Sequence, residues 1–495
     1  MRKAIWIVLI VVLIAGCKLG PNFCLPKAPP VTRYTPKVIT KTVSAPSSPA
    51  GKIQRLKYNQ DICSSWWTIF RSKELNELIE EGLRHNPTME MSQANLRNAR
   101  ANLVAVAGPR LLPNVDVEYT QIREQISLLA VGLNITPTPG QAVPFTFGKR
   151  FDLFNTSVAV SYDLDLFGAN RRQLEALVAE IDHQCYEWEA SYLTLTSNIV
   201  TTAITVASLQ ERIKATETLI KCQKDWLQLA KSNYKLGHSS RFEVLDGESR
   251  LQRTEETLPA LKKNLAKKMN ALAVLVGSFP GESQLPKLNM KAIHLPSELP
   301  VSLPSRLVRQ RPDIRSAESL LHKASAEIGV ATANIFPKVI LGGTYGWFST
   351  ALSSLFNPVN SAWDVGGQVA QSIFRGGEKL AKRRVAIANF EYAWAKYKKV
   401  VLESFQNVAD VLHALEYDAK LLQVRTTAES SAKSRFDLTS LHYRLGKTDY
   451  LTLLNTKERY LQAHLKVVEA EAARFNNTAA LFQALGGGWW NRGRG

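Results

Sequence analysis

The sequence predicts a mainly α-helical chain, built from two tandem repeats, that contributes strands to a membrane β-barrel. Three observations predict this fold class. Residues 233–277 and 442–486 are two copies of one segment. Two uninterrupted helical patterns are each long enough for a helix of roughly 100 Å. Each half of the chain also carries one pair of alternating strand patterns. We therefore expect every repeat to supply a strand pair and long coiled-coil helices.

The duplication is clearest where Tyr234 and Gly237 of the first copy correspond to Tyr443 and Gly446 of the second. A duplication of this length is too long for a small solenoid repeat. Each half of the chain therefore builds the same unit. The copies align without a gap, and further identities fall at Leu236/Leu445, Leu245/Leu454, Arg250/Arg459, Ala271/Ala480, Leu272/Leu481 and Gly277/Gly486.

The N-terminus, residues 1–16, has the organisation of a signal peptide. Two basic residues precede an apolar run from Ala4 to Ala15, and small residues then lead to Cys17. About a dozen apolar residues are fewer than the roughly 20 that a membrane-spanning anchor helix needs. The ending on Cys17 resembles a bacterial lipobox, a signal in which the cysteine is lipidated. The following Lys18 fits sorting to the outer membrane.

Residues 17–65 are expected to form a lipidated extended linker and then an equatorial segment. The stretch to about Ala50 is rich in Pro, Ser and Thr, a composition typical of a linker rather than a core. Such a linker would hold the lipid at one place and the folded body at another.

Four cysteines remain besides Cys17. Cys185 and Cys222 lie in one helical pattern, roughly 55 Å apart along a helix, and cannot pair if that helix is continuous. Cys24 and Cys63 could form a disulfide in an oxidising periplasm, although free thiols are the expectation.

The chain is basic, with a net charge of +19 that falls to +17 when Arg2 and Lys3 leave with the signal peptide. A basic excess can indicate nucleic acid, but an exported lipoprotein meets little of it, so no nucleic-acid partner is expected. Contact with anionic outer membrane lipid or an acidic partner remains open, as do simply solvated faces.

The first repeat is expected over residues 66–277. Its helical patterns end at prolines or glycines, and its strands alternate apolar and polar residues. Pro259 is expected to kink or divide the returning helix. The elements are a helix over 72–110 punctuated by Asn86-Pro87, strands at about 114–124 and 154–165, a long helix over 169–236, a tip near 237 and a returning helix over 240–277.

The second repeat, residues 304–488, follows a proline-containing equatorial connector over 278–303 and precedes a short tail, 489–495. The same order of elements recurs, with Arg311-Pro312 placed like Asn86-Pro87. The elements are a helix over 304–335, strands at about 338–348 and 362–371, a long helix over 378–445, a tip near 446 and a returning helix over 449–485.

Four strands cannot close a barrel, because membrane barrels begin at 8 strands. Two chains would give 8, but side chains fill the interior of a barrel of that size. Three chains would give 12, which leaves a lumen, and residues such as Val339, Leu341 and Trp363 suit lipid on one face. A homotrimer sharing one barrel is the economical solution. A soluble sheet packed on coiled-coil helices would produce the same alternation.

The segment Tyr162-Asp-Leu-Asp-Leu-Phe-Gly168, followed by Asn170-Arg171-Arg172, resembles a motif of the outer membrane efflux protein (TolC-like) family. More narrowly, the chain resembles the NodT-type lipoprotein branch that serves resistance-nodulation-division pumps. Arg311-Pro312-Asp313-Ile314 resembles the signature opening that branch's second repeat, and Asn334-Ile-Phe-Pro337 resembles the approach to its third strand. The match covers essentially the whole chain after Cys17, in the right order.

The resemblance implies a trimer with a 12-stranded β-barrel in the outer membrane on a 12-helix periplasmic tunnel. It implies a passive exit duct for small molecules, with an inner-membrane pump and a periplasmic adaptor at the tunnel's far end. The hairpin tips would line the periplasmic mouth and contact the adaptor. A plain coiled-coil turn without a partner would use the same glycine chemistry. The implied tip residues are Tyr234, Lys235, Leu236, Gly237, Tyr443, Arg444, Leu445 and Gly446.

Asp449 resembles a constriction aspartate of this branch. Three chains would place three carboxylates around a narrow mouth, and such a ring favours cations. An aspartate in this position also suits a helix N-cap, and both roles can hold. Glu243 could join the constriction through a closing salt bridge with Arg444, although an exposed pair contributes less than about 1 kcal/mol.

The sequence gives little support for an enzyme activity, because it has no His-Glu-x-x-His pair, Gly-x-Ser-x-Gly elbow or Walker loop. We therefore expect no enzyme activity, metal or cofactor, and a structural role for Asp163 and Asp165 at a strand-to-helix junction. Two alternatives stay open. An export duct of a protein secretion system would share the fold. A periplasmic adaptor lipoprotein would need only one helical hairpin and a lipoyl-like β module.

Overall fold

The structure, a computed structural model, describes residues 18–46, 48–125, 150–282 and 285–492. The signal peptide and Cys17 lie outside the described residues. The chain forms two compact units. The sheet unit comprises Met1–Cys24, Asn98–Ile181 and Leu320–Trp394, and the hairpin unit comprises Leu25–Arg97, Asp182–Ser319 and Ala395–Gly495.

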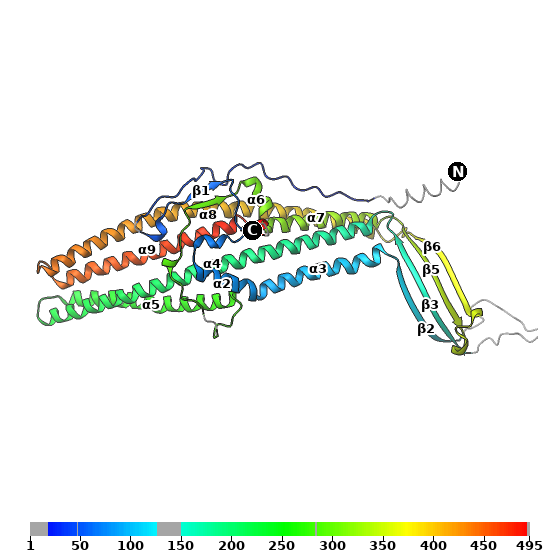
Figure 1. The fold of residues 1–495 in the computed structure, drawn as a ribbon, viewed down its shortest axis with the longest axis horizontal. Helices are drawn as coiled ribbons and strands as arrows, with labels where there is room; N and C mark the ends of the chain where they lie inside the picture. The colour runs from blue at the N-terminus through cyan, green and yellow to red at the C-terminus, as the bar shows by residue number, and fades with distance from the viewer. Residues whose placement is uncertain (1–17, 47, 126–149, 283–284, 493–495) are drawn as a thin grey trace, which may run out of the picture. The chain divides into compact units, whose positions relative to one another are not determined.

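The sheet unit contains the two predicted strand pairs as one antiparallel sheet of order β2-β3-β5-β6 (Figure 1). Tyr345 on β5 pairs with Val158 on β3 and with Trp363 on β6, which fixes the register across the middle of the sheet. The two strand pairs of the repeats are therefore joined directly. The strands are β2 (Asn114–Gln125), β3 (Arg150–Leu164), β5 (Lys338–Ser349) and β6 (Ser361–Ala370).

Both predicted long helices are present and uninterrupted. Each has 67 residues, or about 100 Å at 1.5 Å per residue. Each begins in the sheet unit and ends in the hairpin unit. The long helices are α4 (Ala169–Lys235) and α8 (Glu378–Arg444). The shorter helices are α2 (Lys73–His85), which is followed by α3 (Pro87–Leu111), and α6 (Pro304–Gln310), which is followed by α7 (Pro312–Ala333).

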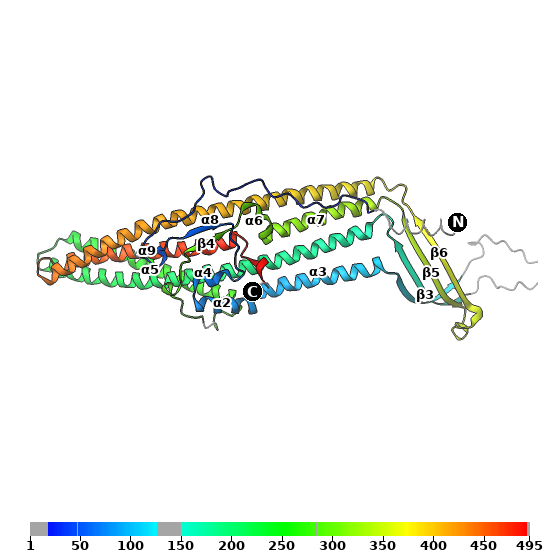
Figure 2. The same cartoon turned by 45° about the horizontal axis from the view of Figure 1, so that its top comes forward.

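The hairpin unit contains two helical hairpins, in which α5 (Arg241–Leu275) returns along α4 and α9 (Tyr450–Ala484) returns along α8 (Figures 1 and 2). Pro259 lies inside α5, which continues through it as one helix. The expected division of this helix was therefore wrong. A helix that packs against neighbours along its length can tolerate the loss of one backbone donor.

The two returning helices end in the same way, as the duplication predicts. Gly277 has φ +80°, and a Cβ there would lie 2.3 Å from the carbonyl oxygen of His85, where α2 (Lys73–His85) ends. Gly486 has φ +94°, and its Cβ would lie 2.5 Å from the carbonyl oxygen of Gln310, where α6 (Pro304–Gln310) ends. Only glycine fits this close approach with a left-handed backbone.

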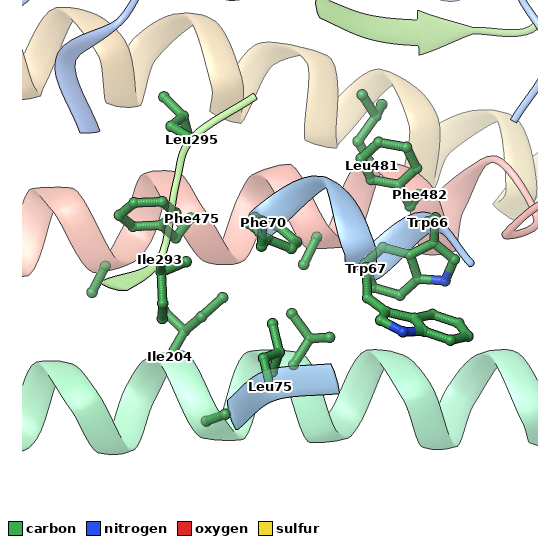
Figure 3. Close-up of a cluster of buried hydrophobic side chains, with 14 of the residues drawn as sticks. Trp66, Trp67, Phe70, Leu75, Ile204, Ile293, Leu295, Phe475, Leu481 and Phe482 are labelled. Atoms are coloured by element: carbon green, nitrogen blue, oxygen red, sulfur yellow. The ribbon is translucent and has the colours of Figure 1, made fainter. Parts of the chain in front are cut away.

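The core of the hairpin unit lies between α4 and α9 and is filled by aromatic and aliphatic side chains (Figure 3). The short helix Trp66–Phe70 inserts Trp66, which stacks on Phe482 with ring centroids 5.4 Å apart. Phe70 and Phe475 are also buried. Full burial of each such side chain stabilises the folded state by about 1.5–3 kcal/mol. This core attaches the segment before α2 to both hairpins.

The segment predicted to be an extended linker followed by an equatorial segment lies in an extended conformation over most of residues 18–46 and is partly buried. β1 (Arg55–Tyr58) pairs in parallel with β4 (Glu298–Val301) of the connector. The fully buried Arg474 of α9 donates to the Thr42 hydroxyl at 2.9 Å and to the Lys52 carbonyl at 2.7 Å. The extended segment has few hydrogen bonds of its own, so a buried guanidinium supplies donors that its oxygen atoms need.

The expected free thiols at Cys24 and Cys63 are confirmed, and both are exposed. Cys185 and Cys222 lie in the continuous helix α4, so an intrachain disulfide between them is excluded.

Candidate functional site

The sheet has one apolar face that extends across all four strands. Val117, Val158, Tyr345 and Trp363 lie directly opposite one another in register, and opposed residues share a face. Val117 is 77% exposed and Trp363 is 73% exposed. Large apolar side chains on a sheet that leaves them uncovered indicate contact with lipid or with another protein.

The opposite face of the sheet is polar. The neighbouring register row contains Asp116, Ala159, Thr344 and Asp364. One face is thus suited to hydrocarbon and the other to water, the alternation that membrane barrels show.

Within the part of the chain that the structure describes, the sheet is open at both edges, because β2 and β6 each pair on one side only. A sheet in a bilayer must satisfy every backbone group, so edge strands in lipid require further strands as partners. The described chain therefore supplies part of a larger closed sheet.

The two hairpin tips have the same turn. The Gly237 amide donates to the Tyr234 carbonyl at 3.0 Å, and the Gly446 amide donates to the Tyr443 carbonyl at 3.0 Å. Both glycines have positive φ, +74° and +67°, as expected after a helix C-terminus. The turn chemistry predicted from the repeat is confirmed.

The tips expose apolar side chains next to basic ones. Leu236 is 70% exposed and Leu445 is 58% exposed, and Lys235 and Arg444 are also exposed. The sequence reasoning missed Phe242, which is 77% exposed on the first turn of α5. Only its place five residues after Gly237 marks it in the sequence. The exposed large apolar residues near the tips are Tyr234, Leu236, Phe242, Leu245, Leu441, Tyr443, Leu445 and Tyr450.

Asp449 is the N-cap of α9. Its carboxylate accepts hydrogen bonds from the Thr452 amide at 2.7 Å and the Thr452 hydroxyl at 2.8 Å. Burial alone would raise the pKa of Asp449, but these hydrogen bonds hold the pKa below its ordinary value. The carboxylate is therefore ionised at neutral pH and remains partly exposed to solvent.

Glu243 does not form the expected salt bridge with Arg444 within the described part of the chain. Its carboxylate accepts a hydrogen bond from the Ser239 hydroxyl of the same tip, and its amide is capped by Ser240. The hydrogen-bonding groups of Glu243 thus find their partners at the start of α5 itself. A side-chain oxygen accepts from a backbone amide of the first turn there, as Asp449 does at the start of α9.

A buried carboxylate on α9, not singled out from the sequence, connects the two hairpins. Glu458 is 5% exposed and accepts a hydrogen bond from the Gln223 amide of α4 at 2.9 Å. Arg250 of α5 lies 3.5 Å from the same carboxylate and 4.6 Å above the Trp226 ring. The repeat drew attention to Arg250, but no local pattern identifies its partner, because the residues meet only through the fold.

The junction between β3 and α4 is structural, as predicted for its aspartates. Asp165 accepts hydrogen bonds from the amides of Asn170 at 3.0 Å and Arg171 at 2.9 Å, which caps the start of α4. Asp163 pairs with Lys338 on β5 at 3.1 Å.

The sequence profile described as "Outer membrane efflux protein" matches residues 78–278 and 303–487. The pyoverdine export outer membrane protein OpmQ of Pseudomonas aeruginosa is 26% identical over 424 residues, which cover 86% of this chain and 87% of OpmQ. The solvent efflux pump outer membrane protein SrpC of Pseudomonas putida is 26% identical over 482 residues, 96% of each chain.

Solved structures are similar over nearly the whole chain. The outer-membrane channel OprN has a TM-score of 0.78 and 26% identity, covering 96% of this chain and 100% of its own. The CmeC outer membrane channel of Campylobacter jejuni has a TM-score of 0.80 and 21% identity, covering 95% of each chain, a likeness that shows the fold alone. The predicted fold class is confirmed.

Proposed function

The chain belongs to the outer membrane efflux protein family, and from this premise we propose how it serves as the outer membrane channel of an efflux system. Three copies form a passive exit duct, through which small molecules leave after an inner-membrane pump and a periplasmic adaptor deliver them. Relatives named for the export of pyoverdine and of solvents support small molecules as cargo.

The observation that carries the proposal is the four-stranded sheet with one apolar face, one polar face and two open edges. Three such sheets give 12 strands, enough to enclose a lumen, whereas 8 strands leave an interior filled by side chains. The apolar face then contacts outer membrane lipid, and Asp116 and Asp364 lie on the water-filled side. Closure satisfies the free edges of β2 and β6.

The hairpin tips are the proposed docking surface for the adaptor. Leu236 and Leu445 offer exposed apolar contacts, and Lys235 and Arg444 offer charge that suits an acidic partner. The same turn occurs twice per chain, so a trimer would present six tips.

Asp449 is the proposed constriction residue at the periplasmic mouth. Its carboxylate is ionised and held in one orientation by Thr452, so three chains would present a fixed ring of negative charge. Glu243 belongs to the same mouth through the other tip, bound to its own helix start rather than to Arg444.

Cys17 is the proposed site of lipidation. The support is the lipobox-like ending of residues 1–16 and the following Lys18. A Cys17→Ser variant should no longer incorporate labelled palmitate, and labelling that survives the substitution would exclude this site.

The proposed channel is tested by recording single-channel currents from the full-length protein, purified with its lipid, in planar bilayers. We expect stable ohmic openings from wild-type protein and none from a Val365→Lys variant, whose charge lies on the lipid-facing side of β6. Asp364→Lys, on the adjacent but polar side, is the matched control and should still conduct. Absence of conductance from wild-type protein that is trimeric and lipidated would contradict the proposal.

The export duct of a protein secretion system is the remaining alternative, because it shares the fold. Co-purification distinguishes the two. A small-molecule pump with its adaptor should be captured by wild-type tips and lost with a Leu236→Asp/Leu445→Asp double variant. Capture of a protein-secretion translocase instead would favour the alternative.

A further inference from the structure

A cavity of about 830 Å³ lies where the strands of the sheet unit join its helices. Its walls come from the junction between β3 and α4, the junction between α7 and β5, and the junction between β6 and α8. Arg110, near the end of α3, completes the lining. All of these residues belong to the sheet unit, so one compact body forms the whole cavity.

Two contacts hold the walls of this cavity together. The Phe167 and Phe336 rings, which both line the cavity, stack with centroids 4.8 Å apart and planes 19° from parallel. Gln371 Nε2 donates to the Ile335 carbonyl at 2.9 Å, which connects the segment after β6 to the segment before β5. The cavity therefore has fixed walls that offer an aromatic surface as well as polar groups.

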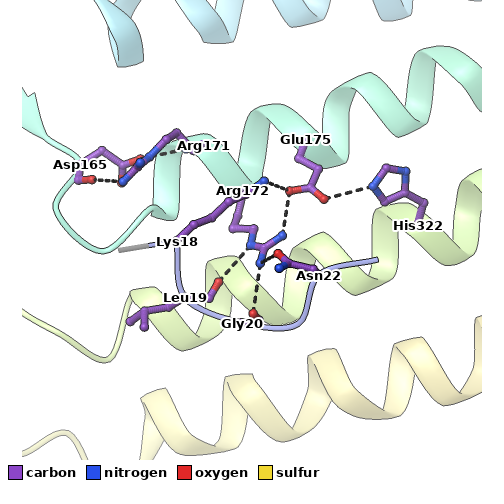
Figure 4. A network of polar contacts seen from close by, with 9 residues as sticks. All are labelled: Lys18, Leu19, Gly20, Asn22, Asp165, Arg171, Arg172, Glu175 and His322. Carbon is purple, nitrogen blue, oxygen red and sulfur yellow. Dashed lines mark hydrogen bonds and ion pairs between the residues drawn. The ribbon is translucent and has the colours of Figure 1, made fainter. Parts of the chain in front are cut away.

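The three carboxylates that line the cavity already have cationic partners. Asp163 pairs with Lys338 at 3.1 Å. Asp165 pairs with Arg171 at 3.2 Å and also caps the start of α4 (Figure 4). Glu378 is bound by two neighbouring cations at once. These carboxylates are therefore not available to neutralise other cations of the cavity.

Two cations of the lining have no carboxylate partner among the residues that the structure describes. Arg110 binds a neutral group, with Nη1 2.6 Å from Oδ1 of Asn170. Lys379, half-buried in the first turn of α8, forms no ion pair with any of those residues. The two cations around Glu378 share a single negative charge. The cavity thus has an excess of positive charge, in a chain whose basic composition had no assigned role.

The polar face of the sheet supplies part of the charged lining. Asp163 and Gln368 lie in one register row with Ile340, and Lys338 lies two residues before Ile340 on the same face. Asp364, four residues before Gln368, shares this face. The proposed barrel has water on this side of the sheet, so dissolved molecules would reach these charged groups.

We propose that the cavity is a binding site for a small solute that carries two or more carboxylate or phosphate groups, held by Arg110 and Lys379. Guanidinium and ammonium groups bind such oxyanions with strong, charge-assisted hydrogen bonds. The stacked rings of Phe167 and Phe336 offer an apolar surface to the rest of the solute. The site assigns anionic small molecules as a substrate class of the duct, and its position in the lumen rests on the proposed function.

The negative ring proposed at Asp449 does not oppose this site. α8 begins beside the cavity and ends five residues before Asp449, about 100 Å further along the helix. Salt at 0.1 M screens charges that are more than about 10 Å apart. A cation preference at the tips and an anion site at the other end of α8 can therefore exist in one duct.

The test measures binding of inorganic tripolyphosphate to the full-length protein in neutral detergent, by isothermal titration calorimetry at constant ionic strength. Wild type is compared with Arg110→Gln/Lys379→Gln and with a control, Arg100→Gln/Arg384→Gln. The control removes the same charge from the same two helices, α3 and α8, at exposed residues outside the lining.

We expect wild type and the control to bind tripolyphosphate equally. The Arg110→Gln/Lys379→Gln variant should bind about tenfold more weakly, because hydrogen bonds from charged donors are lost. Equal binding by all three forms, or no binding by wild type, would overturn the site. Lys379→Glu covers the case in which the double variant does not fold. It should also weaken binding by about tenfold or more, and unchanged binding would count against the inference.

Calorimetry in detergent does not require a conducting channel, so it separates this inference from the proposed function. In planar bilayers, tripolyphosphate should reduce the current of wild type and of the control, but not that of Arg110→Gln/Lys379→Gln. A wild-type channel that conducts but neither binds tripolyphosphate nor is blocked by it would refute the site alone. Protein that binds tripolyphosphate through Arg110 and Lys379 without conducting would refute the channel and leave the site.

The phosphate of an anionic lipid has the same chemistry as a dissolved phosphate, and bilayer composition distinguishes the two. The block by tripolyphosphate is compared in phosphatidylcholine bilayers with and without phosphatidylglycerol. We expect an equal block in both, because the charged lining lies on the polar side of the sheet. A block that phosphatidylglycerol abolishes would assign the cavity to a lipid headgroup and would overturn the solute site.

Discussion

Asp449 combines two roles that conservative substitutions can separate. Asp449→Ala removes both the N-cap of α9 and the negative charge, whereas Asp449→Asn keeps a capping side chain and removes only the charge. Loss of the cap should lower the stability of α9 by about 1 kcal/mol, because the two hydrogen bonds between Asp449 and Thr452 are lost. That cost should appear only with alanine, as faster hydrogen exchange in the first turn of α9.

The charge effect can be estimated separately. A carboxylate about 10 Å from a permeating cation contributes about 0.4 kcal/mol in water, so a ring of three contributes about 1.2 kcal/mol, a roughly eightfold preference for cations. Salt at 0.1 M has a Debye length of about 10 Å and reduces this preference strongly. The assay is therefore the reversal potential across bilayers in dilute KCl gradients. Both variants should lose selectivity equally, and an Asp449→Asn channel as selective as wild type would refute the constriction assignment.

The pH dependence of Asp449 follows from the direction of its pKa shift. Because the folded pKa lies below the ordinary value of 3.8, the capping stability is complete above that value and is lost as the pH falls through the folded pKa. Within one chain, the carboxylate therefore stays charged at all pH values near neutrality. Cation selectivity should be constant there, and a selectivity that titrates near neutral pH would point to a histidine instead.

Three further predictions test the fold. Val365→Lys should cost up to about 2–4 kcal/mol in the bilayer and reduce the trimer recovered from membranes, whereas Asp364→Lys should not; equal losses would contradict the assignment of faces. Arg474→Leu should lower the free energy of unfolding of the hairpin unit by about 3 kcal/mol, because it removes the hydrogen bonds from the guanidinium to the Thr42 hydroxyl and the Lys52 carbonyl; an unchanged urea midpoint would contradict the role of the buried segment. Gly277→Ala and Gly486→Ala should each lower the free energy of unfolding of the protein by a similar amount, about 1–3 kcal/mol. A large difference between the thermal midpoints of the two variants would contradict the equivalence of the repeats.

Most of the helices and strands could be predicted from the sequence, because their apolar residues recur with a regular period. The pattern over 169–236 became α4, Ala169–Lys235, and the strands at about 338–348 and 362–371 became β5 and β6. These elements repeat one pattern over many residues, so single departures such as Pro259 do not hide them. The turns at the hairpin tips could also be predicted, because a glycine that follows a long helix commonly adopts the left-handed conformation.

The contacts and burial of the N-terminal segment could not be predicted from the sequence, because they depend on residues far away in the chain. Thr42 is bound by Arg474, and Leu19 by Arg172, more than a hundred residues away in each case. No composition rule distinguishes such a segment from a solvated linker. The same limit applies to Glu458, whose burial depends on Gln223 of the other hairpin.

The central claim is that three chains complete one barrel around a shared lumen. Native mass spectrometry of the purified, lipidated, conducting protein tests it most directly. The account predicts a single assembly with three times the mass of the lipidated chain. A conducting monomer, or an assembly with a different number of chains, would contradict it, because the strand number and the closure of the edges at β2 and β6 both depend on a trimer.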